Sequence, residues 1–117
     1  MSEVIFDKRD KMQRVEEMLV PGEQLFMVLD CKGRGSCFLG VTDERLIIRD
    51  DGFARFKKAI ISVPYGRIYA VGVDQSAGWV KGSSRITFSA GDDDWDLNFK
   101  GDKARQAYAV VMENLLQ

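Results

Sequence analysis

The sequence lacks histidine altogether, and this absence removes the side chain that enzymes use most often as a general base. A histidine-based catalytic triad is excluded for the same reason. A phosphate-binding loop of P-loop spacing is also missing, because Gly33-Arg34-Gly35 opens a predicted strand and not a helix. We therefore expect a protein that is not an enzyme and that needs no cofactor.

Cysteine is scarce, with only Cys31 and Cys37 in the chain. Two sulfur ligands without histidine do not complete a four-coordinate zinc site, so we expect no metal centre. We expect both cysteines to be free thiols, as is usual in a reducing compartment. An alternative stays open: if the turn between them contains three residues, Gly33 to Gly35, the two side chains lie opposite each other and form a redox-sensitive disulfide.

An excess of charge of one sign and long hydrophobic runs are missing as well. The 17 basic and 18 acidic residues give a net charge of −1, which argues against a nucleic-acid partner. No apolar run approaches the roughly 20 residues that span a bilayer, so no transmembrane segment is expected. Residues 1–10 are charged and lack the apolar centre of a signal peptide, which favours a cytoplasmic location.

What the sequence does contain is a series of short strands, most clearly within residues 37–49. Apolar residues recur there with a period of two on both sides of Thr42-Asp43, and this period is typical of strands. The pattern predicts seven strands, over 24–31, 36–41, 44–49, part of 53–63, 68–74, 85–90 and 94–99. Two sets of core-facing residues stay open for the fourth strand: Ala59, Ile61 and Val63, or Phe56 and Ile60.

Two helices flank these strands. Apolar residues at three- and four-residue spacing predict one helix over 3–19 and another over 102–116. Pro21-Gly22 ends the first helix, and Asp102 is the predicted N-cap of the second. The chain thus divides into an N-terminal helical extension and one following domain, over residues 1–20 and 21–117.

Four short segments in a fixed order carry a resemblance to a known family: LVPGE at 19–23, GVTDERLII at 40–48, ISVPYGRI at 61–68 and ITF at 86–88. With the final helix, they make the chain resemble the bacterial pleckstrin-homology (PH)-like domains. The resemblance implies a mainly β fold, a partly open barrel of four plus three antiparallel strands capped by a C-terminal helix. The N-terminal helix is additional to that pattern. The resemblance also implies that residues 21–117 form a non-enzymatic interaction or assembly module, since some relatives form closed rings.

Basic residues near the first hairpin turn are candidates for anion binding. Phosphoinositide-binding PH domains clamp phosphates with basic residues of this turn, and arginine and lysine suit phosphate through charge and directed donors. The positions upstream of the turn are Leu29 and Asp30, where lipid-binding members usually carry a lysine. The other interpretation is a solvated, mildly basic edge. The candidate anion- or lipid-binding residues are Lys32, Arg34, Arg45, Arg55, Lys57 and Lys58.

Apolar residues outside the predicted core are candidates for partner binding. Trp79 lies in a glycine-rich loop, where it is either tucked under the barrel or presented to a partner. Phe26, Val28 and Ile47 alternate with the predicted core residues, so they form an interface unless the N-terminal helix covers them. The leading hypothesis is protein binding, most simply self-association into a homo-oligomer. The alternative is membrane recruitment through anionic phospholipid or phosphoinositide.

Overall fold

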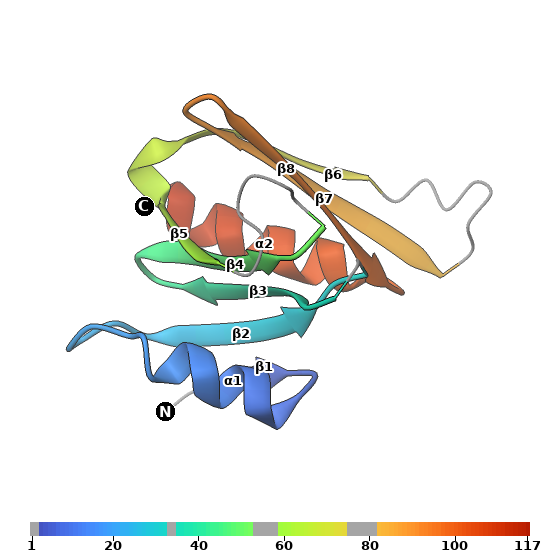
Figure 1. Cartoon of the computed structure of the whole chain (residues 1–117). Coiled ribbons are helices and arrows are strands. Elements are labelled where there is room, and N and C mark those ends of the chain that lie inside the picture. Colours follow the sequence, from blue (N-terminus) through green and yellow to red (C-terminus); the bar gives the residue numbers. More distant parts are fainter. Residues whose placement is uncertain (1–2, 33–34, 53–58, 75–81) are drawn as a thin grey trace.

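The computed structural model describes residues 3–32, 35–52, 59–74 and 82–117. Two β-sheets enclose the larger hydrophobic core, one helix packs between them, and a second helix lies on the outside (Figure 1). In chain order the elements are β1 (Ile5–Phe6), α1 (Arg9–Glu16), β2 (Leu25–Asp30), β3 (Cys37–Thr42), β4 (Arg45–Asp50), β5 (Ile60–Pro64), the 3₁₀-helix η2 (Tyr65–Arg67), β6 (Ile68–Asp74), β7 (Ser83–Ala90), β8 (Asp93–Lys100) and α2 (Lys103–Leu115).

The strands are arranged in one sheet of five and one sheet of three. The first has the order β1-β2-β3-β4-β5 and the second the order β6-β7-β8. Every pair in them is antiparallel except β1 with β2. The prediction of a mainly β, PH-like barrel of four plus three strands with a helix at each end of the chain is therefore confirmed. The barrel is not closed, and β1 is an additional strand.

The main core fills the space between the two sheets. Leu29, Leu39 and Ile48 stand directly opposite one another on β2, β3 and β4, and all three are buried. From the second sheet, Phe88 and Trp95 stack with ring centroids 5.1 Å apart. Burial of such large apolar side chains is the main stabilising contribution in a domain of this size.

The short strand β5 settles the register that the sequence left open. Val63 is buried, and Ile61 packs against the main core. Ile60 packs instead against a second hydrophobic cluster on the outer face of the first sheet. The set with Ile61 and Val63 is therefore the core-facing one, as alternation along a strand requires. Phe56 lies outside the described residues.

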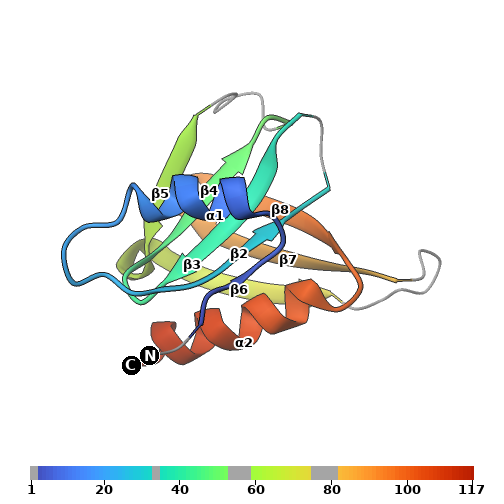
Figure 2. The same ribbon diagram turned by 90° about the horizontal axis from the view of Figure 1, so that it is seen from below.

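The N-terminal segment differs from the predicted continuous helix over 3–19. Ile5 and Phe6 form the short strand β1, which pairs in parallel with Met27 and Val28 of β2. The helix α1 begins only at Arg9 and lies across the outer face of the first sheet (Figure 2). Pairing with β2 gives these residues backbone partners that a local helical pattern does not reveal.

Close packing of α1 on the sheet depends on Gly40 of β3. A Cβ atom at Gly40 would lie 3.2 Å from Cγ1 of Val15, so a larger residue would push the helix away. Val28 and Ile47 are covered there, with 1% and 0% of their surface exposed. Of the two alternatives that the sequence left open for Val28 and Ile47, the structure therefore has coverage by the N-terminal helix and not exposure to a partner. Phe26, the third such residue, is half-buried.

The C-terminal helix α2 packs against both sheets with its small apolar residues. Ala104, Ala107 and Val111 are buried in the main core, as the sequence predicted. The N-cap prediction is wrong in its detail, because the Asp102 side chain makes no capping bond and accepts from Gln106 Nε2 instead. The buried hydroxyl of Ser84 on β7 accepts the hydrogen bond from Ala104 N, at 3.0 Å. A neighbouring strand thus caps this helix.

Candidate functional site

Charged side chains gather at both ends of the strands β2, β3 and β4. At the end where β2 begins, Arg45 forms a bidentate ion pair with Glu23, with Nε–Oε2 and Nη2–Oε1 distances of 2.8 and 2.9 Å. The Glu23 side chain is completely buried. Two further N–H groups of Arg45 donate to Ser62 Oγ and to the backbone oxygen of Met18, at 2.8 and 2.9 Å. Paired geometry of this kind is the strong form of a charge-assisted hydrogen bond.

Two further residues complete this cluster, which we call the Glu23 network. The buried Thr42 hydroxyl donates to Glu23 Oε2 at 2.7 Å, and Tyr65 Oη donates to the Thr42 backbone oxygen at 2.6 Å. Hydrogen bonding from Arg45 lowers the pKa of Glu23 from 4.5 to about 2, despite the opposing effect of burial. Burial raises the pKa of Tyr65 far above its ordinary value, and the charges of Asp43 and Glu23 add to this effect.

The Glu23 network joins three of the segments that carry the family resemblance. Glu23 belongs to LVPGE, Thr42 and Arg45 to GVTDERLII, and Tyr65 to ISVPYGRI. These residues contact one another and not an open surface, so the motifs encode a structural junction. Arg45 is consequently committed to Glu23. This corrects the prediction that Arg45 contributes to an anion site.

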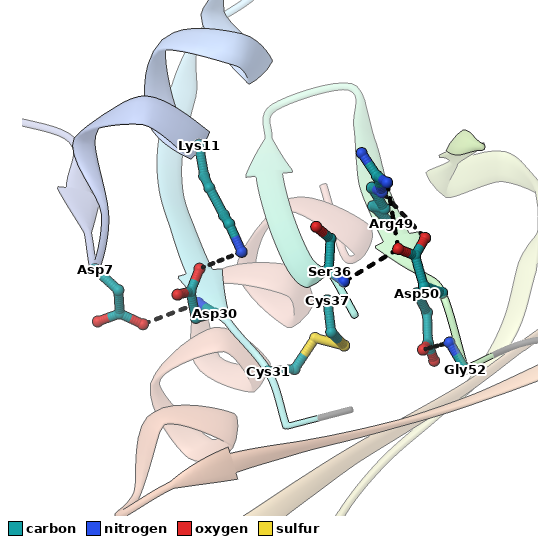
Figure 3. The surroundings of a disulfide bond; sticks show 10 residues. Asp7, Lys11, Asp30, Cys31, Ser36, Cys37, Arg49, Asp50 and Gly52 are labelled. Carbon is teal, nitrogen blue, oxygen red and sulfur yellow. Dashed lines mark hydrogen bonds and ion pairs between the residues drawn. A yellow bond between two sulfur atoms is a disulfide. The ribbon is translucent and has the colours of Figure 1, made fainter. Parts of the chain in front are cut away.

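At the opposite end of the same strands, a disulfide joins Cys31 to Cys37 (Figure 3). The sulfur atoms lie 2.14 Å apart, and the Cα atoms 5.1 Å. Cys31 N also donates to the Cys37 backbone oxygen at 3.0 Å, so the hairpin is paired at this position. The structure thus has the cross-strand disulfide that the sequence left as an alternative to free thiols, and the redox sensitivity of this bond stays a prediction. Hairpin pairing brings the two Cβ atoms close enough to be bridged.

A polar pocket of about 410 Å³ opens beside this disulfide. It lies where four parts of the chain meet: the segment after β1, the end of β2, the end of β8 and the start of α2. We call it the lysine pocket, and its lining residues are Asp7, Lys8, Asp30, Cys31, Lys32, Lys100 and Lys103. Four lysines against two aspartates leave an excess of two positive charges.

The aspartates of the pocket orient two of its lysines. Lys103 Nζ lies 2.7 Å from Asp7 Oδ1, and Lys8 Nζ lies 3.1 Å from Asp30 Oδ2. The two acidic residues are themselves linked, since Asp30 N donates to Asp7 Oδ2 at 2.9 Å (Figure 3). The pocket therefore has a fixed wall from which ammonium groups project.

The other two lysines have no carboxylate partner among the described residues. Lys32 Nζ donates to Ser83 Oγ at 2.7 Å, which places it between the two sheets. A backbone bridge between Lys32 and Asn98 of β8 fixes the chain at the same point. Lys100 is exposed and, within the described part of the chain, forms no ion pair. Both ammonium groups retain N–H donors for a ligand.

The predicted site residues are only partly brought together. Of the two basic candidates within the described residues, Lys32 lines the pocket and Arg45 belongs to the Glu23 network. Sequence reasoning missed Lys8, Lys100 and Lys103, because they come from segments far apart in the chain. The candidates that lie outside the described residues are Arg34, Arg55, Lys57, Lys58 and Trp79.

The two sheets, the helix between them and the order of strands define a PH-like domain. Residues 19–113 match the bacterial PH domain family, so the chain belongs to that family. No curated protein matches the chain at a significant level. Neither described helix is long and apolar enough to span a membrane.

Solved structures share the fold at low sequence identity. A pleckstrin homology domain from Shewanella amazonensis SB2B is 21% identical with a TM-score of 0.64, over 100% of this chain and 93% of that one. A PH-domain-containing protein from Exiguobacterium sibiricum 255-15 is 17% identical with a TM-score of 0.67. That match covers 94% of this chain but only 59% of the other. Likeness at this level concerns the fold and not the ligand.

Proposed function

We propose that this PH domain is a non-catalytic interaction module whose partner is a second copy of the chain. The observation that carries the proposal is the pair of strand edges at one corner of the barrel. Among the described strands, β5 pairs only with β4 and β6 only with β7, and the three residues of η2 join β5 to β6. Each strand therefore has one side of its backbone without a strand partner among the described residues.

The other surfaces of the first sheet are less suited to a partner. Its opposite edge is the two-residue strand β1, which is short for strand addition, and α1 covers the apolar residues of its outer face. The β5–β6 corner also presents Tyr69, which is 71% exposed and is one of four large exposed apolar residues in the described part of the chain. Unpaired strand edges beside exposed aromatic surface are typical sites for strand addition.

A second copy is the partner that this edge fits most simply. When the same strand of two copies pairs antiparallel about a two-fold axis, the free edge of that strand gains a partner in both copies at once. This is the isologous arrangement of most homodimers. Membership in a family of generally non-catalytic modules and the absence of histidine support a binding role.

Light scattering across protein concentration and salt tests the proposal. We expect a stable oligomer that persists at high salt, because backbone hydrogen bonds and apolar contacts are weakly screened. Tyr69→Lys should shift the mass toward the monomer, since it places a charge beside the edge. Leu116→Lys is the matched control, because Leu116 is 76% exposed but lies at the end of α2. A wild-type monomer at all concentrations contradicts self-association.

A further inference from the structure

We propose that the Cys31–Cys37 disulfide is a site of reversible thiol exchange, which a small thiol opens by attacking Cys31 from the lysine pocket. This goes beyond self-association, because the disulfide lies at the pocket end of β2 and β3 and not at the β5–β6 corner. The inference rests on the unequal access to the two cysteines, on the side from which the pocket meets Cys31 and on the charge of the pocket.

The two cysteines differ in how easily a small molecule reaches them. Cys31 is half-buried and lines the pocket, whose volume of about 410 Å³ is within the range of small-molecule sites. Cys37 does not line the pocket, and only 3% of its surface is exposed, because it lies in the main core. The rate of thiol–disulfide exchange depends on the access of a thiolate to one of the two sulfur atoms. A thiol in the pocket therefore reaches Cys31 and not Cys37.

The pocket also lies on the side of Cys31 that the reaction requires. In the first sheet, β2 lies between β1 and β3. Asp7 and Lys8 follow β1, so their wall of the pocket is on one side of β2, whereas Cys37 on β3 is on the other (Figure 3). A thiolate displaces one sulfur of a disulfide by approaching the other sulfur from the opposite side. An attack on Cys31 from the pocket therefore expels Cys37.

The exchange proceeds in two steps. In the first, the thiolate of the small thiol forms a bond to Cys31 Sγ, the bond between the two cysteines breaks, and Cys37 leaves with the electron pair and takes up a proton. In the second, another molecule of the thiol attacks the mixed disulfide and releases Cys31 as a thiolate. Two molecules of the small thiol are then oxidised to their disulfide, and the two cysteines are reduced. Excess of that small disulfide reverses both steps.

The charge of the pocket favours Cys31 as the reactive cysteine. Four lysines and two aspartates leave an excess of two positive charges around the pocket that Cys31 lines. Positive charge stabilises a thiolate, which is the form that attacks a disulfide, whereas apolar surroundings such as those of Cys37 favour the uncharged thiol. The hydrogen bond from Cys31 N to the Cys37 backbone oxygen, at 3.0 Å, holds the pair adjacent. Cys37 is thus placed to close the bond again.

Opening the disulfide should loosen one link between the two sheets. Lys32 N donates to the backbone oxygen of Asn98 on β8 at 2.7 Å, and Lys32 Nζ donates to Ser83 Oγ at 2.7 Å. Because Lys32 directly follows Cys31, the disulfide restrains the residue that makes both contacts. The Glu23 network lies at the other end of the strands and keeps its own hydrogen bonds. We therefore expect reduction to act locally, at the pocket.

Single-cysteine variants treated with oxidised glutathione test which cysteine reacts. Cys37→Ser should form a mixed disulfide at Cys31, detected by mass spectrometry of the intact protein. Cys31→Ser is the matched control and should react about tenfold more slowly or less, because Cys37 is buried. Circular dichroism establishes that both variants are folded. Equal rates, or faster modification of Cys37, would overturn the proposal.

The wild-type protein provides a second test that needs no cysteine variant. Reduced glutathione is added without denaturant, the reaction is stopped with acid, and we expect peptide mapping to find the mixed disulfide on Cys31. At low salt, Lys100→Ala should slow the opening about threefold, because one charge that attracts the thiolate is lost. Arg14→Ala, which removes an exposed charge outside the pocket, should not slow it. A disulfide that opens only in denaturant, or equal slowing in both variants, contradicts attack from the pocket.

Amide hydrogen exchange with and without the thiol checks the structural consequence. Reduction should speed the exchange of Lys32 N–H, which binds Asn98. The amide of Asp43, which donates to the Gln24 backbone oxygen at 3.0 Å near the Glu23 network, should change much less. Equal acceleration at both amides would contradict a local effect. None of these measurements depends on the mass of the oligomer, so this proposal and self-association fail separately.

Discussion

The two ends of the strands β2, β3 and β4 carry similar kinds of charged residue with opposite consequences. At the Glu23 network, every donor group of Arg45 finds an acceptor within the protein, and the Glu23 side chain is completely buried. At the lysine pocket, positive charges outnumber negative ones, and two lysines, Lys32 and Lys100, lack an ion pair within the described residues. A basic residue is therefore evidence for a binding site only after its acidic and hydrogen-bonding partners within the protein have been identified.

Breaking the ion pair of the Glu23 network should have the largest effect. Arg45→Ala leaves a buried carboxylate without its main partner, and we expect the free energy of unfolding to fall by about 3–5 kcal/mol. Urea denaturation measures this loss. Arg85→Ala is the control, because its pair with Asp74 is 46% and 40% exposed and should contribute less than about 1 kcal/mol. Similar losses in both variants would contradict the structural role of Arg45.

Acidic pH should lower the free energy of unfolding through the Glu23 network. The pKa of Glu23 is lowered from 4.5 to about 2 in the folded protein, so its stabilising effect is complete above pH 4.5 and disappears as the pH falls toward 2. The shift corresponds to about 3 kcal/mol. Unfolding measured between pH 6 and pH 2 should therefore be less pH-dependent in Glu23→Gln than in the wild type. Parallel pH profiles would show that Glu23 titrates normally.

Removing the disulfide should have a smaller effect at the other end. The double variant Cys31→Ser/Cys37→Ser frees a short loop in the unfolded chain, and we expect a loss of about 2 kcal/mol. A reducing agent in the urea titration should bring the wild type to the stability of the variant. The same agent should leave the variant unchanged. If the free energy of unfolding of the wild type does not change with the reducing agent, the disulfide is absent in solution.

The smallest effect on stability should come from the pocket itself. Lys100→Ala removes an exposed side chain with no ion pair in the described structure, so the free energy of unfolding should change by less than about 0.5 kcal/mol. Thermal denaturation monitored by circular dichroism checks this. A larger loss of stability would show that Lys100, like Arg45, has a structural role. The lysine pocket and the Glu23 network would then not differ in this respect.

The fold was largely predictable because the hydrophobic pattern that indicates its strands depends on residues close together in the sequence. Alternation along 37–49 depends only on neighbouring residues, and it located β3 and β4 within one residue of their ends. The prediction failed at Ile5 and Phe6, because the partner that makes them a strand is β2, about twenty residues further along the chain. Coverage of Val28 by α1 likewise depends on how closely the helix packs over Gly40.

The candidate site was much less predictable. Lys8 and Lys103 lie at opposite ends of the sequence and meet only because β1 joins β2 while α2 starts beside β8. The residues of the Glu23 network were visible as motifs, yet their contact with one another was not. Sequence patterns identify which residues are charged, whereas folding determines which of those charges neutralise one another.

The position of α1 has a consequence for where the domain should be considered to begin. The family match starts at residue 19, after β1 and α1. A fragment cut there would keep all the strands common to PH domains but would expose Val28, Phe38 and Ile47 to water. The family match therefore begins after a layer, β1 and α1, that covers the outer face of the first sheet.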